Sequence, residues 1–344
     1  MYRFQVSFFK KKTASILILS LWTLCLLSTF SVYLGYNIRQ KLTLIKRIEQ
    51  KQQLRFLSEA GIKYALAQIK KYPFKSYYCL NDTLNNNPSL FKEISLKTGV
   101  FSVSYQYESG TEGLLRTYWG LVDEERKINI NKADFSVMKR FFRIIAGLSE
   151  SEAEELSASI IDWRDPDKEL TLPLNDAEDP YYLSLKYPYE AKDAEFEVLP
   201  ELLLVKGFTE ELLEKIKPYI TIYGNGRINI NTASKAVLLA LGLSADLVER
   251  IIYFRAGKDN LEGTEDDNVF ESEAEILSIL SQIYNLSSGE LREVNQIVQR
   301  YLTTKSNTFL IKSSSHLINK KNVTEEIEVV VEANSGRILF WQEF

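Results

Sequence analysis

Histidine and cysteine are scarce in this sequence of 344 residues. It has one histidine, His316, and two cysteines, Cys25 and Cys79. A histidine-based zinc site or a Ser-His-Asp triad therefore lacks the residues it needs. Cys25 lies in an apolar run and Cys79 in a polar part, so we expect no internal disulfide. Phosphate-loop and cofactor fingerprints are missing as well, and we expect no enzymatic activity.

An excess of basic residues is also missing. The formal net charge is −4, which argues against a protein dedicated to polyanions. The composition, 45% hydrophobic and 26% charged, is that of a globular protein, and the length allows two domains.

The N-terminal region is long, apolar and uncharged. Residues 13–38 are 26 positions without a charge, whereas a membrane-spanning helix needs about 20. Arg3 and Lys10, Lys11 and Lys12 precede the run, which predicts a cytoplasmic N-terminus. A cleaved signal peptide is the alternative, but its apolar core is usually only about 7–15 residues long.

The helical pattern continues beyond the apolar run. Residues 39–72 contain no proline, and no glycine before Gly61, and Pro73 follows them. Their apolar residues recur at helical spacing: Leu42, Ile45, Ile48, Leu54, Leu57, Ala60, Tyr64, Leu66 and Ile69. We therefore predict one helix over residues 15–72, roughly 85 Å long. Residues 15–38 would span the membrane, and residues 39–72 would form an amphipathic continuation.

The start of this helix resembles type IV pilins and pseudopilins. KKKTASILILSLW, residues 10–22, is similar to the end of a prepilin leader and the first mature residues. The resemblance implies a leader over residues 1–14, cleavage between Ala14 and Ser15 by a prepilin peptidase, and N-methylation. Ala14 stands where the family usually has glycine. Leu19 stands where most pilins have a glutamate that pairs with a neighbouring subunit, so the chain suits a filament tip where that partner is absent.

Strand patterns lie at both ends of the remaining sequence. They cover residues 99–108 and 114–123 around a turn, and residues 306–318, 323–333 and 336–344, with a tight turn at residues 334–336. A single hairpin is marginal alone, so we expect residues 73–122 and 306–344 to form one antiparallel sheet packed on the N-terminal helix. Residues 123–305 read mostly as helix and would be an inserted α-helical domain.

The insert contains a doubled motif. KININKADFSVMKRFFRIIAGLS starts at Lys127 and RININTASKAVLLALGLS at Arg227. Each leads from Ile-Asn-Ile-Asn through a helix and a glycine turn to a second helix, over residues 127–165 and 227–256. A shorter third copy covers residues 199–222. Such helix-hairpin-helix-like repeats resemble the DNA-binding repeats of bacterial competence receptors.

Two features favour a structural use of these repeats. The binding form prefers Gly-hydrophobic-Gly, but after Gly147, Gly207 and Gly242 a serine or threonine replaces the second glycine, as a helix N-cap would. Residues 121–226 hold 23 acidic and 13 basic side chains, and a net charge of −10 repels phosphates. Nucleic acid is therefore not expected as a partner. The side chains of Asn129, Asn131, Asn229 and Asn231 should cap the following helix and bond nearby backbone.

Three segments of the insert resemble K-type minor pseudopilins of type II secretion, the GspK family: IIDWRDPD, NDAEDPYYLSL and FEVLPELLLVKGF, at residues 160–167, 175–185 and 196–208. That family usually has Gly-Ala-Glu where this chain has Asp176-Ala177-Glu178. The resemblance implies an α+β pseudopilin fold, a long N-terminal helix packed on an antiparallel sheet with a large inserted α-helical domain. It also implies a single-pass inner-membrane protein with a periplasmic globular part, placed at the pseudopilus tip. Its partners would be the other minor pseudopilins, the major pseudopilin, prepilin peptidase and inner-membrane lipid.

Two acidic clusters are candidates for metal binding. The first holds Asp259, Glu262, Asp266, Asp267 and Glu271 on a glycine-containing loop, which suits the oxygen preference of Ca²⁺, although a solvated acidic loop is the alternative. The resemblance favours calcium, since K-type pseudopilins are associated with it. The second cluster holds Asp162, Asp165, Asp167, Asp176, Glu178 and Asp179. There Arg164 and Lys168 can pair with the acids in place of a metal.

Two other functions remain open from the sequence. One is a membrane-anchored DNA receptor of the competence kind, which salt-sensitive DNA binding would reveal. The other is a minor pilin of a type IV pilus, which the neighbouring genes would distinguish.

Overall fold

The computed structural model describes residues 12–72, 76–110, 113–173, 175, 177–318 and 320–344. The chain forms two compact units, Met1–Phe56 and Leu57–Phe344. The helices are α1 (Lys12–Lys71), α2 (Pro88–Phe91), α3 (Phe135–Phe141), α4 (Glu150–Arg164), α5 (Asp179–Leu183), α6 (Glu210–Ile216), α7 (Lys235–Ala240), α8 (Ala245–Arg255), α9 (Glu273–Tyr284) and α10 (Ser288–Tyr301). Short 3₁₀ segments cover Glu124–Arg126, Leu199–Leu204 and Lys217–Tyr219, and a π-helical turn covers Phe142–Ala146.

The strands are mostly short, apart from two that form the centre of the main sheet. They are β1 (Ile94–Ser95), β2 (Gly99–Val103), β3 (Tyr105–Glu108), β4 (Leu115–Tyr118), β5 (Val122–Asp123), β6 (Ile128–Asn129), β7 (Ile220–Thr221), β8 (Ile228–Asn229), β9 (Leu302–Thr303), β10 (Thr308–Leu317), β11 (Lys320–Glu332) and β12 (Arg337–Glu343).

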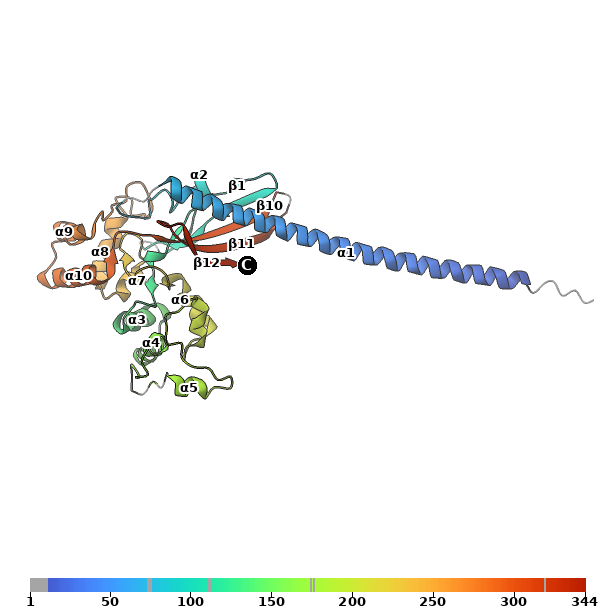
Figure 1. Cartoon of the computed structure of the whole chain (residues 1–344). Coiled ribbons are helices and arrows are strands. Elements are labelled where there is room, and N and C mark those ends of the chain that lie inside the picture. Colours follow the sequence, from blue (N-terminus) through green and yellow to red (C-terminus); the bar gives the residue numbers. More distant parts are fainter. Residues whose placement is uncertain (1–11, 73–75, 111–112, 174, 176, 319) are drawn as a thin grey trace, which may run out of the picture. The chain divides into compact units, whose positions relative to one another are not determined.

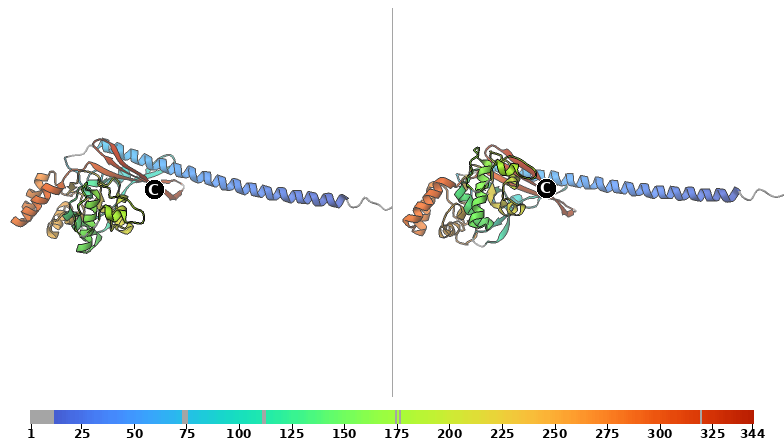
Figure 2. Two further views of the ribbon diagram at one scale, coloured as in Figure 1. Left: turned by 60° about the horizontal axis from the view of Figure 1, so that its bottom comes forward. Right: turned by 90° about the horizontal axis from the view of Figure 1, so that it is seen from below.

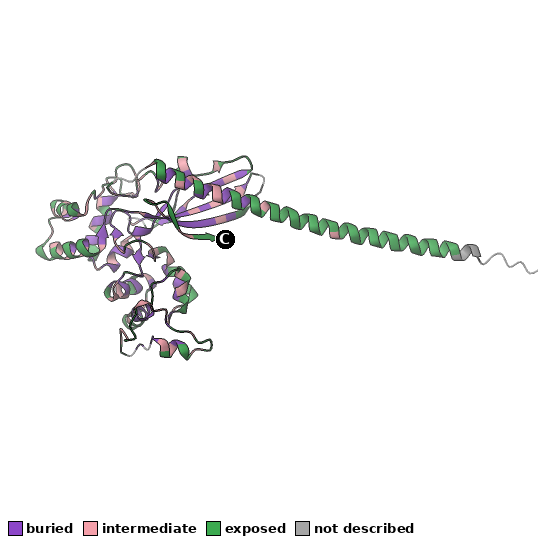
Figure 3. Cartoon of the chain, in the orientation of Figure 1, coloured by how far each residue is buried: buried purple, intermediate pink, exposed green. Residues whose placement is uncertain are grey.

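The long N-terminal helix is continuous, as the sequence predicts. In the described residues, α1 is the one helix long and apolar enough to cross a membrane. Its apolar side chains from Ile16 to Ile38 are exposed, as the green ribbon in Figure 3 shows. The backbone of Ala14 and Ser15 lies in α1, whereas residues 1–11 of the expected leader and Pro73 lie outside the described residues.

The main sheet joins the two ends of the globular part. Its strand order is β1-β2-β10-β11-β12, and all pairs are antiparallel. One edge of β10 pairs with β11, and the other is shared by β5, at Phe309 and Leu310, and by β2, at Ser313–Leu317. Strands before and after the insert therefore meet on β10, as expected (Figure 1).

The expected hairpin of residues 99–108 with 114–123 forms only at the end next to its turn. Tyr105–Glu108 pairs with Leu115–Tyr118, while β2 and β5 both pair with β10 and not with each other. The reason is burial: Tyr105, Tyr107 and Tyr118 leave the sheet edge and pack with Leu310 and other residues of its second face. The expectation of one long two-stranded hairpin is corrected on this point.

The C-terminal half of α1 packs on the first face of this sheet. Alternate strand residues meet the helix residues in one core: Ile62, Ala65, Ile69, Phe309, Ile311, Ile327, Val329 and Val331. Gly61 makes the close approach possible, because a Cβ atom there would lie 2.1 Å from Ser313 Oγ and 2.9 Å from the Phe101 ring. Ser58 adds a polar contact by donating to the Glu325 carbonyl at 2.8 Å.

The insert leaves the sheet after β5 and returns before β10. It has a core of its own, which runs from Ile128 to Leu302 through residues of α3, α4, α7 and α8. Its helices gather beside the main sheet within residues 57–344, in Figure 1 and in the turned views of Figure 2. The insert thus belongs to the same compact unit as the sheet.

The close fit at Gly61 predicts a test of the helix–sheet contact. Gly61→Ala should lower the free energy of unfolding by about 1–3 kcal/mol, because the added methyl overfills the contact with Ser313. Gly289→Ala is the matched control on α10, where the nearest atom is 3.9 Å away, and should be neutral or stabilising by up to about 1 kcal/mol. Denaturant unfolding of the detergent-solubilised chain measures both. Equal effects at the two positions would contradict the packing described.

Candidate functional site

The two main repeats have the same local geometry. In each, a two-residue strand pairs in parallel with a later segment: β6 with β7, and β8 with β9. The residue after each short strand extends the pairing by one more hydrogen bond. Ile130 N–H donates to the Thr221 carbonyl and Ile230 N–H to the Thr303 carbonyl, both at 2.9 Å. The doubled sequence is therefore a doubled structure.

The first asparagine of each motif links its repeat to a neighbouring segment. Asn129 donates to the Tyr223 carbonyl at 2.7 Å, and Asn229 donates to the Tyr78 carbonyl at 3.0 Å and to Ser306 Oγ at 2.8 Å. Asn229 also lies 3.3 Å from a carboxylate oxygen of the buried Asp123. The contact between Asn229 and Asp123 joins the insert to the strand β5 that leads into it.

The second asparagine of each motif pairs with one backbone residue in both directions. Asn131 donates to the Phe196 carbonyl and accepts from its N–H, at 3.0 and 2.8 Å. Asn231 does the same with Phe270, at 2.9 and 3.0 Å. Each pair closes the long loop that follows the second helix of its repeat.

The expectation that these asparagines cap the following helices is wrong. Asp134 and Ser234 stand at those N-caps, and their side chains accept from Val137 and Val237 N–H. The expected bonds to nearby backbone do form, because the Oδ1 atoms of Asn129 and Asn229 accept from Asn131 and Asn231 N–H, both at 2.9 Å. The amide nitrogens bond to more distant groups of the chain.

The turn glycines all have left-handed backbone. The φ values of Gly147, Gly207 and Gly242 are +74°, +87° and +105°, which disfavour other residues. Carbonyls at two of these turns are bonded inside the protein: Lys215 Nζ donates to Ala146, and Arg140 Nε donates to Ala240. These turns therefore pack against basic side chains of the insert itself.

An arginine ends the second helix of each repeat and returns to its motif. Arg164 donates to the carbonyls of Ile130 and Ala133, and Arg255 donates to those of Ile230 and Ala233. Apart from Asp162, which lies in the last turn of α4, the acids of the two clusters follow these arginines, so they lie in equivalent loops of the two repeats. The loops differ in how their acids are compensated.

In the second repeat, a buried ion pair satisfies the most buried acid. Glu262 is 3% exposed and pairs with Arg255, which is 2% exposed. The same carboxylate accepts from Tyr107 Oη at 2.9 Å and from Gly110 N–H at 2.7 Å, both on the β3–β4 hairpin. Burial is the largest single effect on the pKa of Arg255 and lowers it, but the charge and hydrogen bond of Glu262, together with Tyr107 and Asp267, outweigh burial and raise that pKa.

The other acids of this loop bond mostly to its own backbone. Asp266 accepts from Lys258 and Asp259 N–H at 2.7 and 3.1 Å, and Asp267 accepts from Gly263 and Thr264 N–H at 2.7 and 3.2 Å. Glu271 is exposed. The structure thus does not gather these five acids around a common centre, and Glu262 is turned to Arg255.

In the first repeat, buried carboxylates lack such partners. Asp162 is fully buried, and Thr171 N–H donates to its Oδ1 at 2.8 Å, but its Oδ2 has no donor among the described residues. The same holds for both carboxylate oxygens of Glu178 and for Oδ1 of Asp165 and Asp193. Asp193 was not anticipated from the sequence, because it lies beyond the acidic cluster and joins it only through the fold.

The cations of this region pair with only part of the cluster and leave Asp162 and Glu178 without an ion pair among the described residues. Arg164 is turned to the motif backbone, and Lys168 bridges Asp179, at 3.0 Å, and Asp193. Asp167 accepts from Glu169 N–H, and Asp176 lies outside the described residues.

Burial and mutual repulsion raise three carboxyl pKa values in this cluster. Burial, followed by the neighbouring Asp162 charge, raises the pKa of Glu178 to about 7. Burial, followed by Asp167 and Asp162, raises the pKa of Asp165 to about 6. Burial also raises the pKa of Asp162.

These oxygens fit the donor chemistry of Ca²⁺, which prefers carboxylates. Within the described ranges, no three acidic, histidine or cysteine side chains already form a metal-coordinating set. The cluster is thus a candidate by donor type, burial and lack of partners.

The buried ion pair predicts a large stability effect. Glu262→Gln should lower the free energy of unfolding by about 3–5 kcal/mol, because it leaves the Arg255 charge buried without a counter-charge. Glu249→Gln is the control, since Glu249 pairs with Lys235 at 3.0 Å with both side chains exposed, and should cost less than about 1 kcal/mol. Denaturant titration compares the two. A Glu262→Gln loss as small as the control would show that the pair is not a main support of this loop.

Two comparisons with known proteins match this architecture. Residues 121–225 match a family model described as type II secretion system (T2SS), protein K. The fold is similar to a chain in the crystal structure of the GspK-GspI-GspJ complex from enterotoxigenic Escherichia coli, with a TM-score of 0.65 and 16% sequence identity. That match covers 87% of this chain and 99% of the other. No curated protein sequence matches the chain.

The two findings are independent. The family model identifies by sequence the part of the insert that holds the first repeat and the Asp162–Glu178 cluster. At 16% identity the structural likeness speaks for the fold alone, and it covers more of the chain than the family model does. Residues 121–225 of this chain are thus similar in sequence to protein K of type II secretion, and the fold is similar to that of a chain in the GspK-GspI-GspJ complex.

Proposed function

We propose that this chain occupies the tip of the pseudopilus and from there supports export of proteins across the outer membrane. The observation that carries the proposal is the insert, which lies between β5 and β10 and makes up more than half of residues 57–344. In a fibre whose subunits stack through their N-terminal helices, a head enlarged in this way would overlap with the next copy. At the end of the fibre it meets no next copy.

The first turns of the mature helix support the same position. Leu19 is 66% exposed, and it stands where most pilins carry a glutamate for a neighbouring subunit. A carboxylate in lipid is costly unless it is paired. A terminal subunit lacks the neighbour that would pair with it, so leucine is the favourable residue there.

The same helix supports an anchored precursor. We propose a single pass through the inner membrane, with the N-terminus in the cytoplasm and the globular part in the periplasm. Prepilin peptidase would cut between Ala14 and Ser15, followed by N-methylation. The support is the exposed apolar stretch of α1 and the basic residues before it.

The partners proposed are other pseudopilins. The similar solved chain is part of a complex of GspK, GspI and GspJ. By analogy, this chain would assemble with the corresponding minor pseudopilins and, below them, with the major pseudopilin, through α1 and the flanking sheet. The helix-hairpin-helix-like repeats would serve as scaffold for the insert, since their turns and asparagines are bonded within it.

We also propose that the first repeat binds Ca²⁺ through Asp162, Asp165, Glu178 and the adjacent Asp167. The support is the set of buried carboxylate oxygens without donors and the raised pKa values. A bound divalent cation would offset the mutual repulsion of these acids and fix the loop that Asn131 closes. For the loop of Asp259–Glu271 the support is weaker, because Arg255 already balances Glu262.

The calcium proposal predicts a pH-dependent response. The folded-state pKa of Glu178, about 7, exceeds the unfolded value of 4.5, so without calcium this group makes stability fall as pH rises through that window. Calcium needs the deprotonated acids. Added Ca²⁺ should therefore raise the melting temperature by several degrees, about 2–4 °C per kcal/mol, at pH 8 and much less at pH 5.

Paired variants locate the response. Asp162→Asn with Glu178→Gln should abolish it, and Asp266→Asn with Asp267→Asn should retain it. Thermal unfolding monitored by circular dichroism measures each. If only Asp266→Asn with Asp267→Asn loses the response, calcium binds the loop of Asp259–Glu271 instead. A wild-type melting temperature that does not change with calcium would refute the proposal.

The tip position predicts where the chain lies in isolated pseudopili. An epitope beside the exposed Tyr187 of the insert should bind gold-labelled antibody at one end of each fibre. An epitope on the major pseudopilin is the control and should label the whole length. Label along the shaft from the insert epitope would contradict the proposal.

A further inference from the structure

A group of basic residues follows directly after the apolar stretch of α1. Arg39, Lys41, Lys46 and Arg47 lie within nine positions, and all four side chains are exposed. Glu49 is the one acidic residue between positions 39 and 55. We call the four basic residues the collar. Their sign is opposite to that of the insert, where residues 121–226 carry a net charge of −10.

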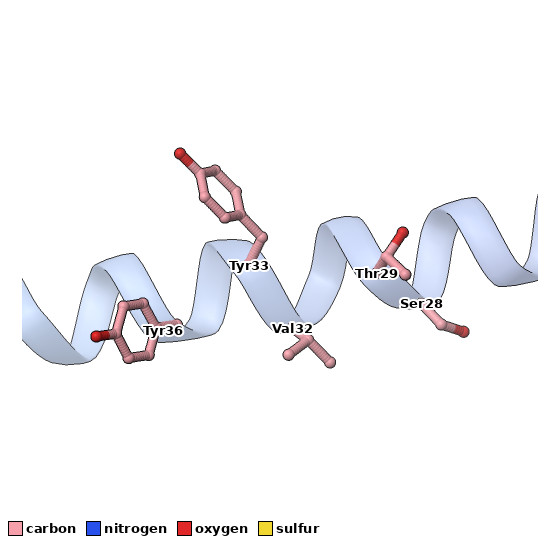
Figure 4. Close-up of a pocket in the computed structure, with 5 residues that line it drawn as sticks. All are labelled: Ser28, Thr29, Val32, Tyr33 and Tyr36. Carbon is pink, nitrogen blue, oxygen red and sulfur yellow. The ribbon is translucent and has the colours of Figure 1, made fainter.

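Two tyrosines mark the depth at which the collar begins. Tyr33 and Tyr36 are 66% and 62% exposed, and they line a shallow recess on α1 with Ser28, Thr29 and Val32 (Figure 4). Tyrosines are enriched where hydrocarbon meets headgroups. From Ile16 to Tyr36 the helix rises about 30 Å, which is the thickness of the hydrocarbon core. Tyr36 is therefore at the far hydrocarbon boundary when Ile16 is at the near one.

The helical rise then places the collar at the headgroups. Arg39 lies about 4.5 Å and Lys41 about 7.5 Å beyond Tyr36, within a headgroup layer of roughly 5–8 Å. Lys46 and Arg47 lie about 15 Å beyond it, but their long side chains can reach back toward the surface. Their charges then act across a screening length of about 8 Å.

We propose that the collar binds the anionic headgroups of the outer, periplasmic leaflet of the membrane that α1 spans. This inference rests on the membrane anchoring proposed above. The chemistry is that of phosphate diesters on a lipid surface, which guanidinium and ammonium groups bind by charge and hydrogen bonds. In the precursor, before the proposed cleavage after Ala14, Arg3 and Lys10–Lys12 add positive charge on the other side of the membrane segment.

The collar has a consequence for assembly. A pseudopilin must leave the bilayer when it enters the fibre, and contacts with anionic headgroups oppose that step. The anionic lipid content of the membrane would thus set how strongly this subunit is retained.

Lipid spin-label spectroscopy on the full chain in phosphatidylcholine vesicles tests the inference. Trace spin-labelled phosphatidylglycerol should be immobilised by the protein roughly three- to ten-fold more than spin-labelled phosphatidylcholine at low salt, because each basic side chain favours the anionic surface. About 1 M salt should reduce this preference toward one, because it shortens the screening length. The variant with Arg39, Lys41, Lys46 and Arg47 all changed to glutamine should lose the preference at low salt.

The control removes the same charge from the globular part. Lys97→Gln, Lys258→Gln, Lys305→Gln and Arg337→Gln change four exposed residues together and should keep the preference. Equal immobilisation of the two lipids by the wild type, or a collar variant that keeps the preference, overturns the inference. The wild type could also show no lipid preference but retain an acidic pseudopilin through the collar in a salt-sensitive way. That result would assign the collar to a protein contact and would overturn the inference too. Failure of the chain to stay in vesicles after alkaline washing refutes the membrane anchor itself, and with it the collar.

Discussion

The packing of α1 on the main sheet at Gly61 is the contact on which the rest of this structure depends. The sheet is assembled from strands on both sides of a long insert, and β10 receives β2 and β5 on a single edge. These short strands would be marginal without a helix to cover their apolar face. Because Gly61 has no side chain, the helix comes close enough to bury Ile62 and Ile69 in a common core with Ile311. The same helix continues as the apolar stretch, so one element serves both the fold and the proposed anchor.

The insert keeps its shape by returning polar side chains to its own backbone. Both repeats use an arginine at the end of the second helix and an asparagine in the motif, and each bonds carbonyl or N–H groups that irregular chain would otherwise leave unsatisfied. The repeated positions of the doubled motif are thus accounted for by contacts within the chain. The turns that would approach a phosphate are occupied by Lys215 and Arg140 of the same domain.

Local patterns in the sequence predict the parts of this fold that depend on local forces. The long helix follows from an uninterrupted helical pattern, and the closing strands and their turn at Gly336 follow from alternation and turn chemistry. The split of the first hairpin could not be predicted, because it depends on which face buries Tyr105 and Tyr118. The sequence alone does not identify the N-cap of α3, because aspartate, serine and asparagine all favour that position. The contact of Asn129 with the Tyr223 carbonyl, far away in the sequence, leaves Asp134 as the N-cap.

The acidic loops show the same limit for the candidate site. By sequence, the loop with Asp266 and Asp267 is the denser cluster, yet its buried acid finds Arg255 seven positions away and the hydroxyl of Tyr107, 155 positions away. The equivalent arginine of the first repeat, Arg164, makes the same contacts to backbone, but no acid of its loop reaches it as Glu262 reaches Arg255. Asp162 and Glu178 are left with buried oxygens and raised pKa values. A duplicated scaffold thus carries two solutions to one electrostatic problem: an internal cation in one copy, and in the other a set of carboxylates that requires protons or an external cation to be stable.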